Sequence, residues 1–327
     1  VWLGADMADV RGQLVARRAL EVAACGGHNL VFVGSPGSGK SMLAKRLPGI
    51  LPPLTYEEAV ETSAVYSVAG LVPAGKGLVR ARPFRSPHHS VSATAIAGGG
   101  SVPRPGEVSL AHNGVLFLDE LPEFSREALE VLRQPLEDGI VTVSRVHGSA
   151  TYPCRFMLVA AMNPCKCGYL GHPTRPCSCT PSAVDQYLRR ISGPLMDRID
   201  LHVHVEPVAY GDLAQAADGE SSAAIRTRVA AVRQIQRERY KALPGVYCNA
   251  QLPGNRLRQF CPMTPAAEAV LRAAFERMGL SARAYDRILR VSRTVADMDG
   301  SEVLDSRHIA EAVQYRSLDR RFTPVSL

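Results

Sequence analysis

Gly34-Ser-Pro-Gly37-Ser-Gly39-Lys40-Ser41 is the stretch that decides the fold of this 327-residue chain. It follows the apolar run Leu30-Val-Phe-Val33, and helix-forming residues come after it. Glycines let a backbone wrap closely around phosphates, and a strand before such a loop with a helix behind it is the context that the pattern needs. We predict a triphosphate-binding loop, with Lys40 on the β- and γ-phosphates and Ser41 on Mg²⁺. The expected nucleotide contacts are Gly34, Ser35, Pro36, Gly37, Ser38, Gly39, Lys40, Ser41 and Met42.

Short, almost wholly apolar runs alternate with helical patterns over residues 1–207. Such runs are typical of strands that are buried on both faces of a sheet, and their alternation with helices indicates a parallel sheet flanked by helices. We therefore expect an α/β domain here. The expected strands are 30–33, 115–118, 156–162 and 201–205, and the expected helices are 12–24, one from the phosphate loop to Pro48, 55–68, and one from an N-cap at Ser125 to Gly139.

Residues 208–222 are small and polar, with Gly211, Gly219 and Ser221-Ser222, which favours a linker. Strand patterns cease after it, and periodic helical stretches take over. We expect a smaller, all-helical second domain over 223–327. Its predicted helices are 223–241, 265–279, 281–297 and 305–316.

Three polar residues directly follow expected strands. Asp119 and Glu120 come after 115–118, and Asn163 comes at the end of 156–162. Side chains at the carboxyl ends of neighbouring parallel strands lie beside the phosphate crevice. We expect Asp119 to hold Mg²⁺, Glu120 to polarise the attacking water and Asn163 to orient that water. For Asn163 the alternative is a turn of the chain before Pro164.

The composition is that of an ordinary globular protein, with 46% hydrophobic and 21% charged residues. No apolar run of about eighteen residues and no signal peptide is visible, so we expect no membrane span. Eight cysteines without a secretory signal favour a reducing compartment, and hence the cytoplasm. The net charge of +7 fits a nucleic-acid partner without demanding one. The first residue is Val1 rather than Met, as expected of a piece of a longer protein.

Several motifs occur in one order along nearly the whole chain. They are Asp9-Val-Arg-Gly-Gln13, the loop Gly34–Ser41, Arg85-Ser-Pro-His-His-Ser90, Leu116-Phe-Leu-Asp-Glu-Leu-Pro-Glu-Phe124, Ala161-Met-Asn-Pro-Cys165, Ser192-Gly-Pro-Leu-Met-Asp-Arg-Ile-Asp200 and Ser281-Ala-Arg-Ala-Tyr-Asp-Arg-Ile-Leu289. This order resembles the Mg-chelatase-like AAA+ ATPases, and within them the ComM/YifB branch. The resemblance implies an AAA+ P-loop fold in which the helical domain is a lid.

The resemblance also implies a homo-oligomeric ring, a hexamer, with ATP held between subunits. Asn163 then resembles the family's sensor-1 residue. Arg198 resembles an arginine finger that reaches the γ-phosphate of a neighbouring subunit, where a guanidinium stabilises the charge of the transition state. The alternative for Arg198 is an ion pair with Asp197 or Asp200 of its own chain.

Two further positions take a role from the resemblance alone. Arg283 resembles the sensor-2 arginine of the lid, with Arg287 and Arg290 as rivals. Gly12 lies in a segment that resembles the lining of the adenine pocket. Longer members of the branch carry a Lon-protease-like domain ahead of this module, and we expect that domain to be missing from this sequence.

Residues 62–106 contain no acid, and the part at about 70–106 resembles an insertion that projects toward the pore of the ring. Residues 140–148 alternate like a strand and reach Gly148-Ser149, which predicts a second hairpin. Basic loops around a pore fit a DNA backbone without reading bases, and the alternative is a solvated charged surface. His88 and His89 favour a structural or phosphate contact over a shared metal. The basic residues of 62–106 are Lys76, Arg80, Arg82, Arg85 and Arg104.

Four cysteines cluster within residues 165–179, with His172 between the two pairs. Four thiols so close together are able to hold Zn²⁺, although one residue between paired cysteines is a tight spacing. The alternatives are unliganded reduced thiols and an Fe–S or redox role. The other cysteines are scattered, and we expect them to be inert. The cluster consists of Cys165, Cys167, Cys177 and Cys179.

Three functions remain open. The first, implied by the resemblance, is an ATP-driven ring motor on DNA, with helicase or branch-migration activity in natural transformation or recombination. The second is a remodeller of a protein partner, as in the magnesium chelatase that inserts metal into a porphyrin. The third is a nucleotide-gated scaffold. The acid-free segment 62–106 favours DNA.

Overall fold

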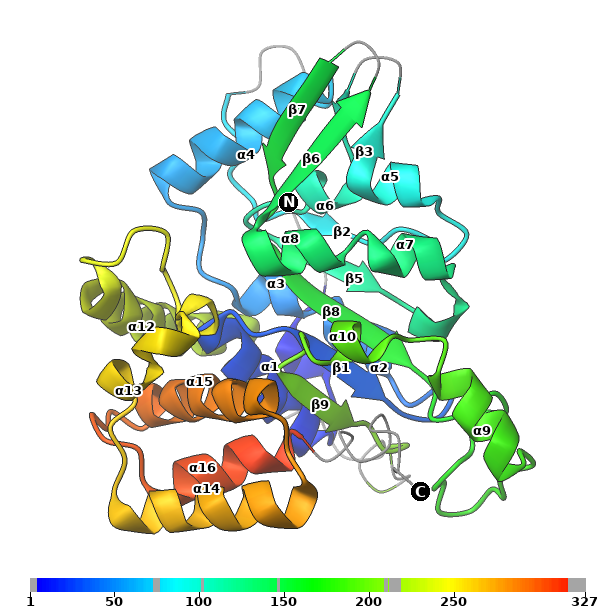
Figure 1. The fold of residues 1–327 in the computed structure, drawn as a ribbon, viewed down its shortest axis with the longest axis vertical. Coiled ribbons are helices and arrows are strands. Elements are labelled where there is room, and N and C mark those ends of the chain that lie inside the picture. Colours follow the sequence, from blue (N-terminus) through cyan, green and yellow to red (C-terminus); the bar gives the residue numbers. More distant parts are fainter. Residues whose placement is uncertain are drawn as a thin grey trace. The chain divides into compact units, whose positions relative to one another are not determined.

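A computed structural model of the chain describes residues 5–72, 77–100, 103–145, 148–208, 211 and 219–316 (Figure 1). Its main sheet has five strands in the order β2-β5-β8-β1-β9. Strand β2 pairs in parallel with β5, and β5 pairs in parallel with β8. The predicted α/β fold, a parallel sheet with flanking helices, is confirmed. The strands are β1 Leu30–Val33, β2 Phe84–Arg85, β5 Val115–Leu118, β8 Met157–Met162 and β9 Leu201–His204.

Strands β1, β5 and β8 are buried along their whole length. Their apolar, often β-branched residues suit a strand that is covered on both faces. The register sets Val115 opposite Met157 and Leu118 opposite Ala160. Because parallel strands present their carboxyl ends at one edge, the residues that follow β5 and β8 come together there.

Strand β2 was missed by the sequence analysis. It is only two residues long, Phe84 opposite Val115 and Arg85 opposite Leu116, and both are half-buried. Two residues are too few to show any hydrophobic period. The strand forms because β5 offers it an edge, which is a tertiary effect.

Two segments that were each predicted as one continuous helix form two short helices instead. The helix after the phosphate loop consists of α2 Lys40–Ala44 and α3 Leu47–Ile50, and Pro48 lies in the first turn of α3, where its missing N–H costs nothing. The predicted helix from Ser125 to Gly139 consists of α7 Arg126–Glu130 and α8 Arg133–Asp138. Pro135 in α8 has no N–H to donate back to residue 131, so the ladder breaks before it.

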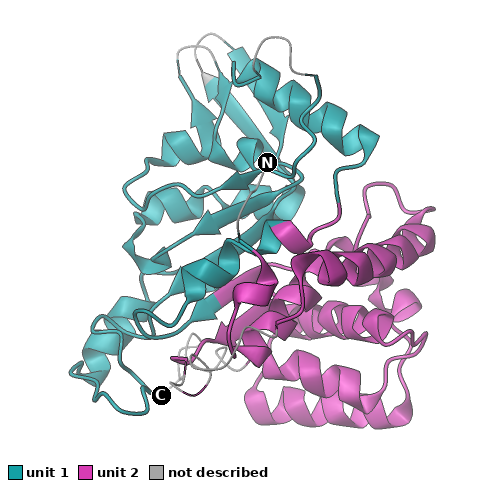
Figure 2. Ribbon diagram, turned by 180° about the vertical axis from the view of Figure 1, so that it is seen from behind, with its two compact units in different colours: residues 1–5, 32–48, 53–198 teal, residues 6–31, 49–52, 199–327 magenta. Residues whose placement is uncertain are grey.

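The chain divides into two compact units (Figure 2). The first unit holds residues 1–5, 32–48 and 53–198. Several of its helices begin after a Ser or Thr whose side-chain oxygen accepts a backbone N–H; these N-caps are Thr55, Ser92, Ser125 and Thr180. Its further elements are α4 Tyr56–Val68, α5 Ala93–Ala97, β3 Gly98–Gly99, β4 Arg104–Pro105, α6 Glu107–Leu110, η2 Leu121–Glu123, α9 Pro181–Leu188 and α10 Gly193–Met196.

The predicted second hairpin is confirmed. Strands β6 Ile140–Arg145 and β7 Gly148–Pro153 pair antiparallel and stand at the top of Figure 1. Gly148 and Ser149, where the turn was expected, already pair with Arg145 and Ser144 as part of β7. Residues 146–147 lie outside the described residues, as do Lys76 of the acid-free segment and most of the predicted linker.

The second unit holds residues 6–31, 49–52 and 199–327, and the predicted C-terminal helical region is confirmed within it. Helix α15 (Ala282–Met298) packs against α16 (Ser306–Gln314) and α1 (Leu14–Gly26), and α12 (Ser222–Tyr240) also packs against α1. Among the described residues, no helix is long and apolar enough to cross a membrane. The elements outside the main sheet are η1 Met7–Asp9, α1 Leu14–Gly26, α12 Ser222–Tyr240, η3 Asn249–Gln251, η4 Gly254–Arg256, α13 Leu257–Phe260, α14 Pro265–Met278, α15 Ala282–Met298 and α16 Ser306–Gln314.

Candidate functional site

The loop after β1 has the backbone that its sequence requires. Gly37 and Gly39 adopt φ angles of 78° and 92°, in the left-handed region that side chains other than glycine's rarely allow. The Gly34 N–H donates to the carbonyl of Met162 at 3.2 Å, which ties the start of the loop to the end of β8. Helix α2 begins directly after Gly39. The loop is thus turned back toward the carboxyl end of the sheet.

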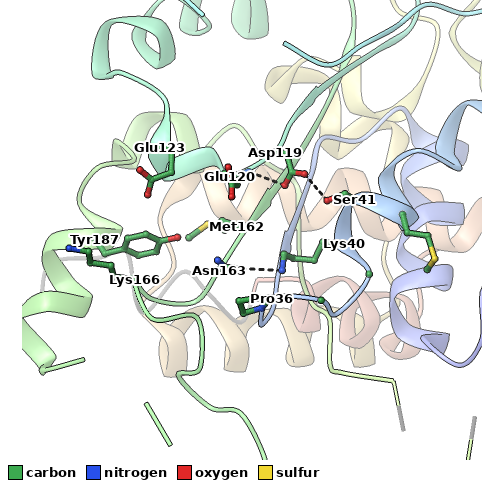
Figure 3. Close-up of a pocket in the computed structure, with 13 residues that line it drawn as sticks. Pro36, Lys40, Ser41, Asp119, Glu120, Glu123, Met162, Asn163, Lys166 and Tyr187 are labelled. Atoms are coloured by element: carbon green, nitrogen blue, oxygen red, sulfur yellow. Dashed lines mark hydrogen bonds between the residues drawn. The ribbon is translucent and has the colours of Figure 1, made fainter. Parts of the chain in front are cut away.

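Lys40 is buried, with 8% of its surface exposed. Its ammonium donates to the carbonyls of Gly34 and Ser35, both at 2.8 Å, and to Oδ1 of Asn163 at 3.2 Å (Figure 3). Burial lowers the pKa of Lys40, and the negative charge of Asp119 opposes that shift. The result is a fixed, poorly hydrated cation at the loop, which is what a phosphate oxygen would bind.

Ser41 and Asp119 converge from α2 and from the end of β5. The Ser41 hydroxyl donates to Oδ2 of Asp119 at 2.6 Å (Figure 3). A hydroxyl and a carboxylate are the hard oxygen ligands that Mg²⁺ takes in proteins together with phosphates and waters. The donor set therefore fits Mg²⁺.

Glu120 stands at the same edge with its backbone constrained. Its φ is 53°, a left-handed value that is uncommon for a residue other than glycine, and its N–H donates to Oδ1 of Asp119 at 3.0 Å. The Oε2 atom lies 3.2 Å from Nδ1 of His89. The sequence analysis did not bring these two residues together.

Asn163 lies at the end of β8, and its side chain faces the site through the contact with Lys40. A cavity of about 580 Å³ opens between these groups. Four of its lining residues were not assigned to the site by the sequence analysis: Glu123 and Met162 lie within recognised motifs but were given no role there, and no motif contains Lys166 or Tyr187. The burial of one of these, Tyr187, raises the pKa of its phenol to about 12. The cavity is lined by Pro36, Gly37, Gly39, Lys40, Ser41, Met42, Asp119, Glu120 and Asn163, and by the missed residues Glu123, Met162, Lys166 and Tyr187.

Arg198 is buried and anchored within its own unit. Its guanidinium donates to Oε2 of Glu137 and to the Pro194 carbonyl, both at 2.6 Å. An intrachain ion pair, the alternative to the finger role, is therefore present. The acid in it is Glu137, which the sequence analysis did not consider when it weighed Asp197 and Asp200.

The other predicted arginine lies in the second unit. Arg283 is exposed in the first turn of α15. Of its rivals, Arg287 is half-buried and pairs with Asp200 at 3.0 Å, and buried Arg290 donates to the Leu252 carbonyl at 2.8 Å. Burial lowers the pKa of Arg290. Arg283 is thus the member of the three that is most open to solvent.

Gly12 also lies in the second unit, ahead of α1. It has a φ of 60°, and the next residue, Gln13, shares the left-handed conformation with a φ of 55°. The Gln13 side-chain amide donates to the carbonyl of Glu206 at 2.6 Å. The segment is therefore a sharp turn that the hydrogen bond from Gln13 fixes in place.

The four clustered cysteines gather in the loop between β8 and α9. All four Sγ atoms lie within 4.8 Å of one another, and those of Cys165, Cys167 and Cys177 are separated by 3.4 to 3.7 Å. Zinc–sulfur bonds of about 2.3 Å in a tetrahedron place sulfurs about 3.8 Å apart, so the geometry suits such an ion. Backbone N–H groups of Cys167 and Cys179 donate to Sγ of Cys179 and Cys177, both at 3.4 Å. The N–H groups of Tyr169 and Ser178 lower the pKa of Cys167 to about 5.

His172 lies in the same loop but turns its Nδ1 to the backbone N–H groups of Thr174 and Arg175, at 3.2 and 3.0 Å. Of the other cysteines, Cys25, Cys154 and Cys261 are buried, and burial raises the pKa of each to about 12. A thiol that stays protonated is a poor nucleophile and a poor ligand. These three fit the predicted inert role.

The acid-free segment is neutralised in part by acids outside it. The Arg82 guanidinium donates to Glu58 at 2.9 Å, and Arg85 makes two bonds of 2.7 Å to Glu107. Arg80 and Arg104 are exposed. The positive surface is therefore smaller than the sequence count implies.

Two family models cover the chain almost from end to end. The model described as magnesium chelatase, subunit ChlI, matches residues 6–213. The model described as magnesium chelatase, subunit ChlI C-terminal, matches residues 219–316. The second match begins close to the start of α12.

Individual relatives agree with these matches. The chain is 48% identical over 96% of its length to the uncharacterized protein YifB of Escherichia coli K12, and 46% identical over 98% to the competence protein ComM of Haemophilus influenzae Rd. It spans 61% and 62% of the length of these relatives, or about three fifths. A more distant relative, the magnesium-chelatase 67 kDa subunit of Chlorobaculum parvum, is 30% identical over 48% of this chain.

Proposed function

Because this chain belongs to the magnesium chelatase subunit ChlI family of AAA+ ATPases, we propose that its cavity binds ATP with Mg²⁺ and hydrolyses it. The observation that carries the proposal is the convergence of Lys40, Asp119 and Asn163 on one cavity beside a glycine loop. A loop of this kind cradles phosphates, and a cation, a metal-binding carboxylate and a water-orienting amide complete the set that phosphoryl transfer needs.

Each residue has one task in this reaction. Lys40 binds the β- and γ-phosphate oxygens, and Ser41 with Asp119 holds Mg²⁺, which supplies neutralisation of the phosphate charge when bound. Glu120 accepts a proton as the water oxygen attacks the γ-phosphorus and the bond to the bridging oxygen breaks, which releases ADP. Asn163 orients that water. Residues Gly34 to Met42 supply the surrounding loop and its N–H groups.

We propose further that the ATPase works between subunits of a hexameric ring. Arg198 reaches the γ-phosphate of the neighbouring subunit, Arg283 of the helical lid responds to the nucleotide, and Gly12 borders the adenine. Residues 1–207 form the ATPase module and 223–327 its lid. The family membership supports the assembly, since AAA+ ATPases act as oligomers.

For the substrate we propose DNA, bound through its backbone, with helicase or branch migration as the output. Two observations support this choice: one relative is named a competence protein, and Arg80 and Arg104 are exposed on the acid-free segment. Both arginines offer point charges to phosphates and read no bases.

Steady-state ATPase measured with and without single-stranded and branched DNA tests the proposal. We expect DNA to raise turnover, and we expect the DNA affinity to fall steeply with salt, by a slope of about 0.7 per phosphate contact on single strands. Arg80→Ala with Arg104→Ala weakens the stimulation. Arg272→Ala, an exposed arginine of the second unit, is the control and leaves it unchanged. No stimulation by any DNA, together with no salt-sensitive binding, contradicts the DNA proposal.

A second candidate is a remodeller of a protein partner. The similarity to a magnesium-chelatase subunit, 30% over 162 residues, favours it. In that case turnover responds to a protein and remains insensitive to nucleic acid, so the same assay separates the two.

We also propose that Cys165, Cys167, Cys177 and Cys179 hold Zn²⁺. The four convergent sulfurs and the backbone N–H groups that donate to them support this proposal. Metal analysis of purified protein is expected to give one zinc per chain, lost in Cys167→Ser with Cys177→Ser and kept in Cys154→Ala. Absence of zinc in the unaltered chain contradicts the assignment.

A further inference from the structure

The cysteine cluster begins directly beyond the nucleotide cavity, within the same unit. Strand β8 ends at Met162, and the next residue, Asn163, accepts a hydrogen bond from Lys40 at 3.2 Å. Buried Pro164 alone then separates Asn163 from Cys165. Because a proline ring fixes its own φ, few torsions lie between the amide that faces the cavity and the first sulfur of the cluster. A shift of Cys165 therefore also moves Asn163.

The far end of the cysteine loop returns to the same cavity. Helix α9 begins directly after the last cysteine, with Thr180 as its N-cap. Near the end of this helix, buried Tyr187 lines the cavity, and the backbone of Asn163 hydrogen-bonds its phenol. Both ends of the loop thus lie at the proposed nucleotide site (Figure 3).

Between these ends, a glycine packs the cysteine loop against the phosphate loop. Gly168 follows Cys167, and its N–H donates to the Cys165 carbonyl at 3.0 Å. A Cβ at Gly168 would lie 2.6 Å from Cδ of Pro36 and 3.8 Å from Cγ of Asn163. The backbone beside the first two cysteines is therefore packed against the phosphate loop and against the amide that contacts Lys40.

The two pairs of cysteines meet through their sulfurs. Sγ of Cys177 lies 3.5 Å from Sγ of Cys167 and 3.7 Å from Sγ of Cys165. The residues between the pairs bond among themselves, as where Nδ1 of His172 accepts the N–H of Arg175 at 3.0 Å. Without a metal, thiolates so close together repel one another, whereas Zn²⁺ bonded to all four sulfurs ties the pairs together. The metal would thus close the loop that touches the nucleotide site at both ends.

We propose that the cysteine loop, closed by Zn²⁺, holds the phosphate loop and Asn163 in their nucleotide-binding arrangement, so that zinc and ATP bind cooperatively. The inference rests on the proposed ATP and zinc sites and adds a coupling between them, in which the metal takes no part in the chemistry. Because such coupling is reciprocal, zinc raises the affinity for ATP by the same factor by which ATP raises the affinity for zinc.

The first test measures the affinity of the full chain for a fluorescent, non-hydrolysable ATP analogue, with zinc bound and after its removal by a chelator. We expect zinc removal to weaken binding at least about fivefold, the lower end of the range for coupled sites, and added Zn²⁺ to restore it. Cys167→Ser with Cys177→Ser is expected to reproduce the loss. Cys154→Ala, which removes a thiol outside the cluster, is the matched control and binds like the wild type. An affinity that zinc removal leaves unchanged overturns the inference.

The second test needs no folded zinc-free protein. It measures the zinc affinity by competition with a chromogenic chelator, with and without the analogue and in excess Mg²⁺. We expect the analogue to raise the zinc affinity of the wild type by the factor found in the first test. Lys40→Ala, at an analogue concentration that saturates only the wild type, shows no such rise, which excludes direct capture of zinc by the nucleotide. A zinc affinity that the analogue does not alter in the wild type overturns the inference.

Gly168→Ala tests the packed contact that connects the two loops. This variant keeps all four cysteines, and its added Cβ pushes the cysteine loop away from Pro36, so we expect the coupling factor to fall toward one. Gly171→Ala is expected to keep the wild-type factor, because its added Cβ has no atom within 4 Å. Equal coupling factors in the two variants overturn the role of the Pro36 contact.

The possible failures are distinguishable. A purified chain without zinc contradicts the zinc assignment, and a zinc-loaded chain that does not bind the analogue contradicts the ATP proposal; either result overturns the inference with it. Independent binding of zinc and the analogue overturns the inference alone and leaves both sites standing.

Discussion

Lys40 is a buried cation, and its ammonium group contacts backbone carbonyls of the phosphate loop. Its ammonium is held by Gly34 and Ser35, whose oxygens are neutral, and its pKa is lowered by burial. A cation solvated only by dipoles gains more from an incoming phosphate than one that already pairs with a carboxylate. The residue is thus prepared for an anion.

We predict that Lys40→Ala weakens ATP binding about 10- to 100-fold, because a hydrogen bond to a charged group contributes about 1.5 to 3 kcal/mol. Binding of a fluorescent ATP analogue measures the effect. Lys45→Ala is the matched control, since Lys45 is exposed just beyond the end of α2. Equal affinity of Lys40→Ala and the wild type would mean that the loop does not hold the phosphates.

At the scale of elements, the loop between β8 and α9 joins the cysteine cluster to the phosphate loop. Gly168, inside that loop, has a φ of 86°, and a Cβ there would lie 2.6 Å from Cδ of Pro36. The pyrrolidine ring has no torsion that can move this atom away. The two loops are therefore packed as one structure, and Asn163 with Cys165 lies at their junction.

Gly168→Ala is predicted to shift the phosphate loop and to raise the KM for ATP several-fold, in addition to a cost of about 1 kcal/mol for the left-handed backbone. Gly171→Ala is the matched control, since its φ is 77° but no atom lies within 4 Å of the added Cβ. We expect Gly171→Ala to lose a similar amount of thermal stability but to keep the wild-type KM for ATP. If both variants have the same KM, the contact with Pro36 has no role in the site.

At the scale of the whole molecule, the proposed ring would complete each ATP site with a residue of a second subunit. Arg198 has two candidate roles: it forms an ion pair with Glu137 of its own chain, and it is the proposed arginine finger. If Arg198 has only a structural role, its loss removes the ion pair with Glu137 of α8. If Arg198 is the finger, its loss also removes a positive charge from the γ-phosphate of the neighbouring subunit.

We predict that Arg198→Ala and Glu120→Gln chains, each inactive alone, recover part of the ATPase activity when mixed, since some interfaces then have both residues intact. Glu137→Gln separates the readings further. It loses the ion pair but keeps the arginine, so activity is retained if Arg198 acts on a neighbour. No recovery in the mixture, with an inactive Glu137→Gln, would assign Arg198 to its own chain.

Much of this fold could be predicted from the sequence because its central strands are almost entirely apolar. Strands β1, β5 and β8 are covered on both faces, so their apolar runs stand out against the amphipathic helices, and all three were predicted within a residue of their ends. The helix breaks near Pro48 and Pro135 were missed because a proline in a first turn is compatible with a helix, and only the local hydrogen-bond ladder decides where that turn begins.

The sequence by itself determined that a glycine loop stands between β1 and α2 and which acid follows which strand. A glycine loop between a strand and a helix, and a carboxylate after a buried strand, are local patterns whose geometry the backbone dictates. Only the tertiary structure decided that His89 meets Glu120, that Glu137 binds Arg198, and that the four thiols converge. These contacts join segments through strand order and loop packing, and no local period or spacing records which distant segment a side chain will meet.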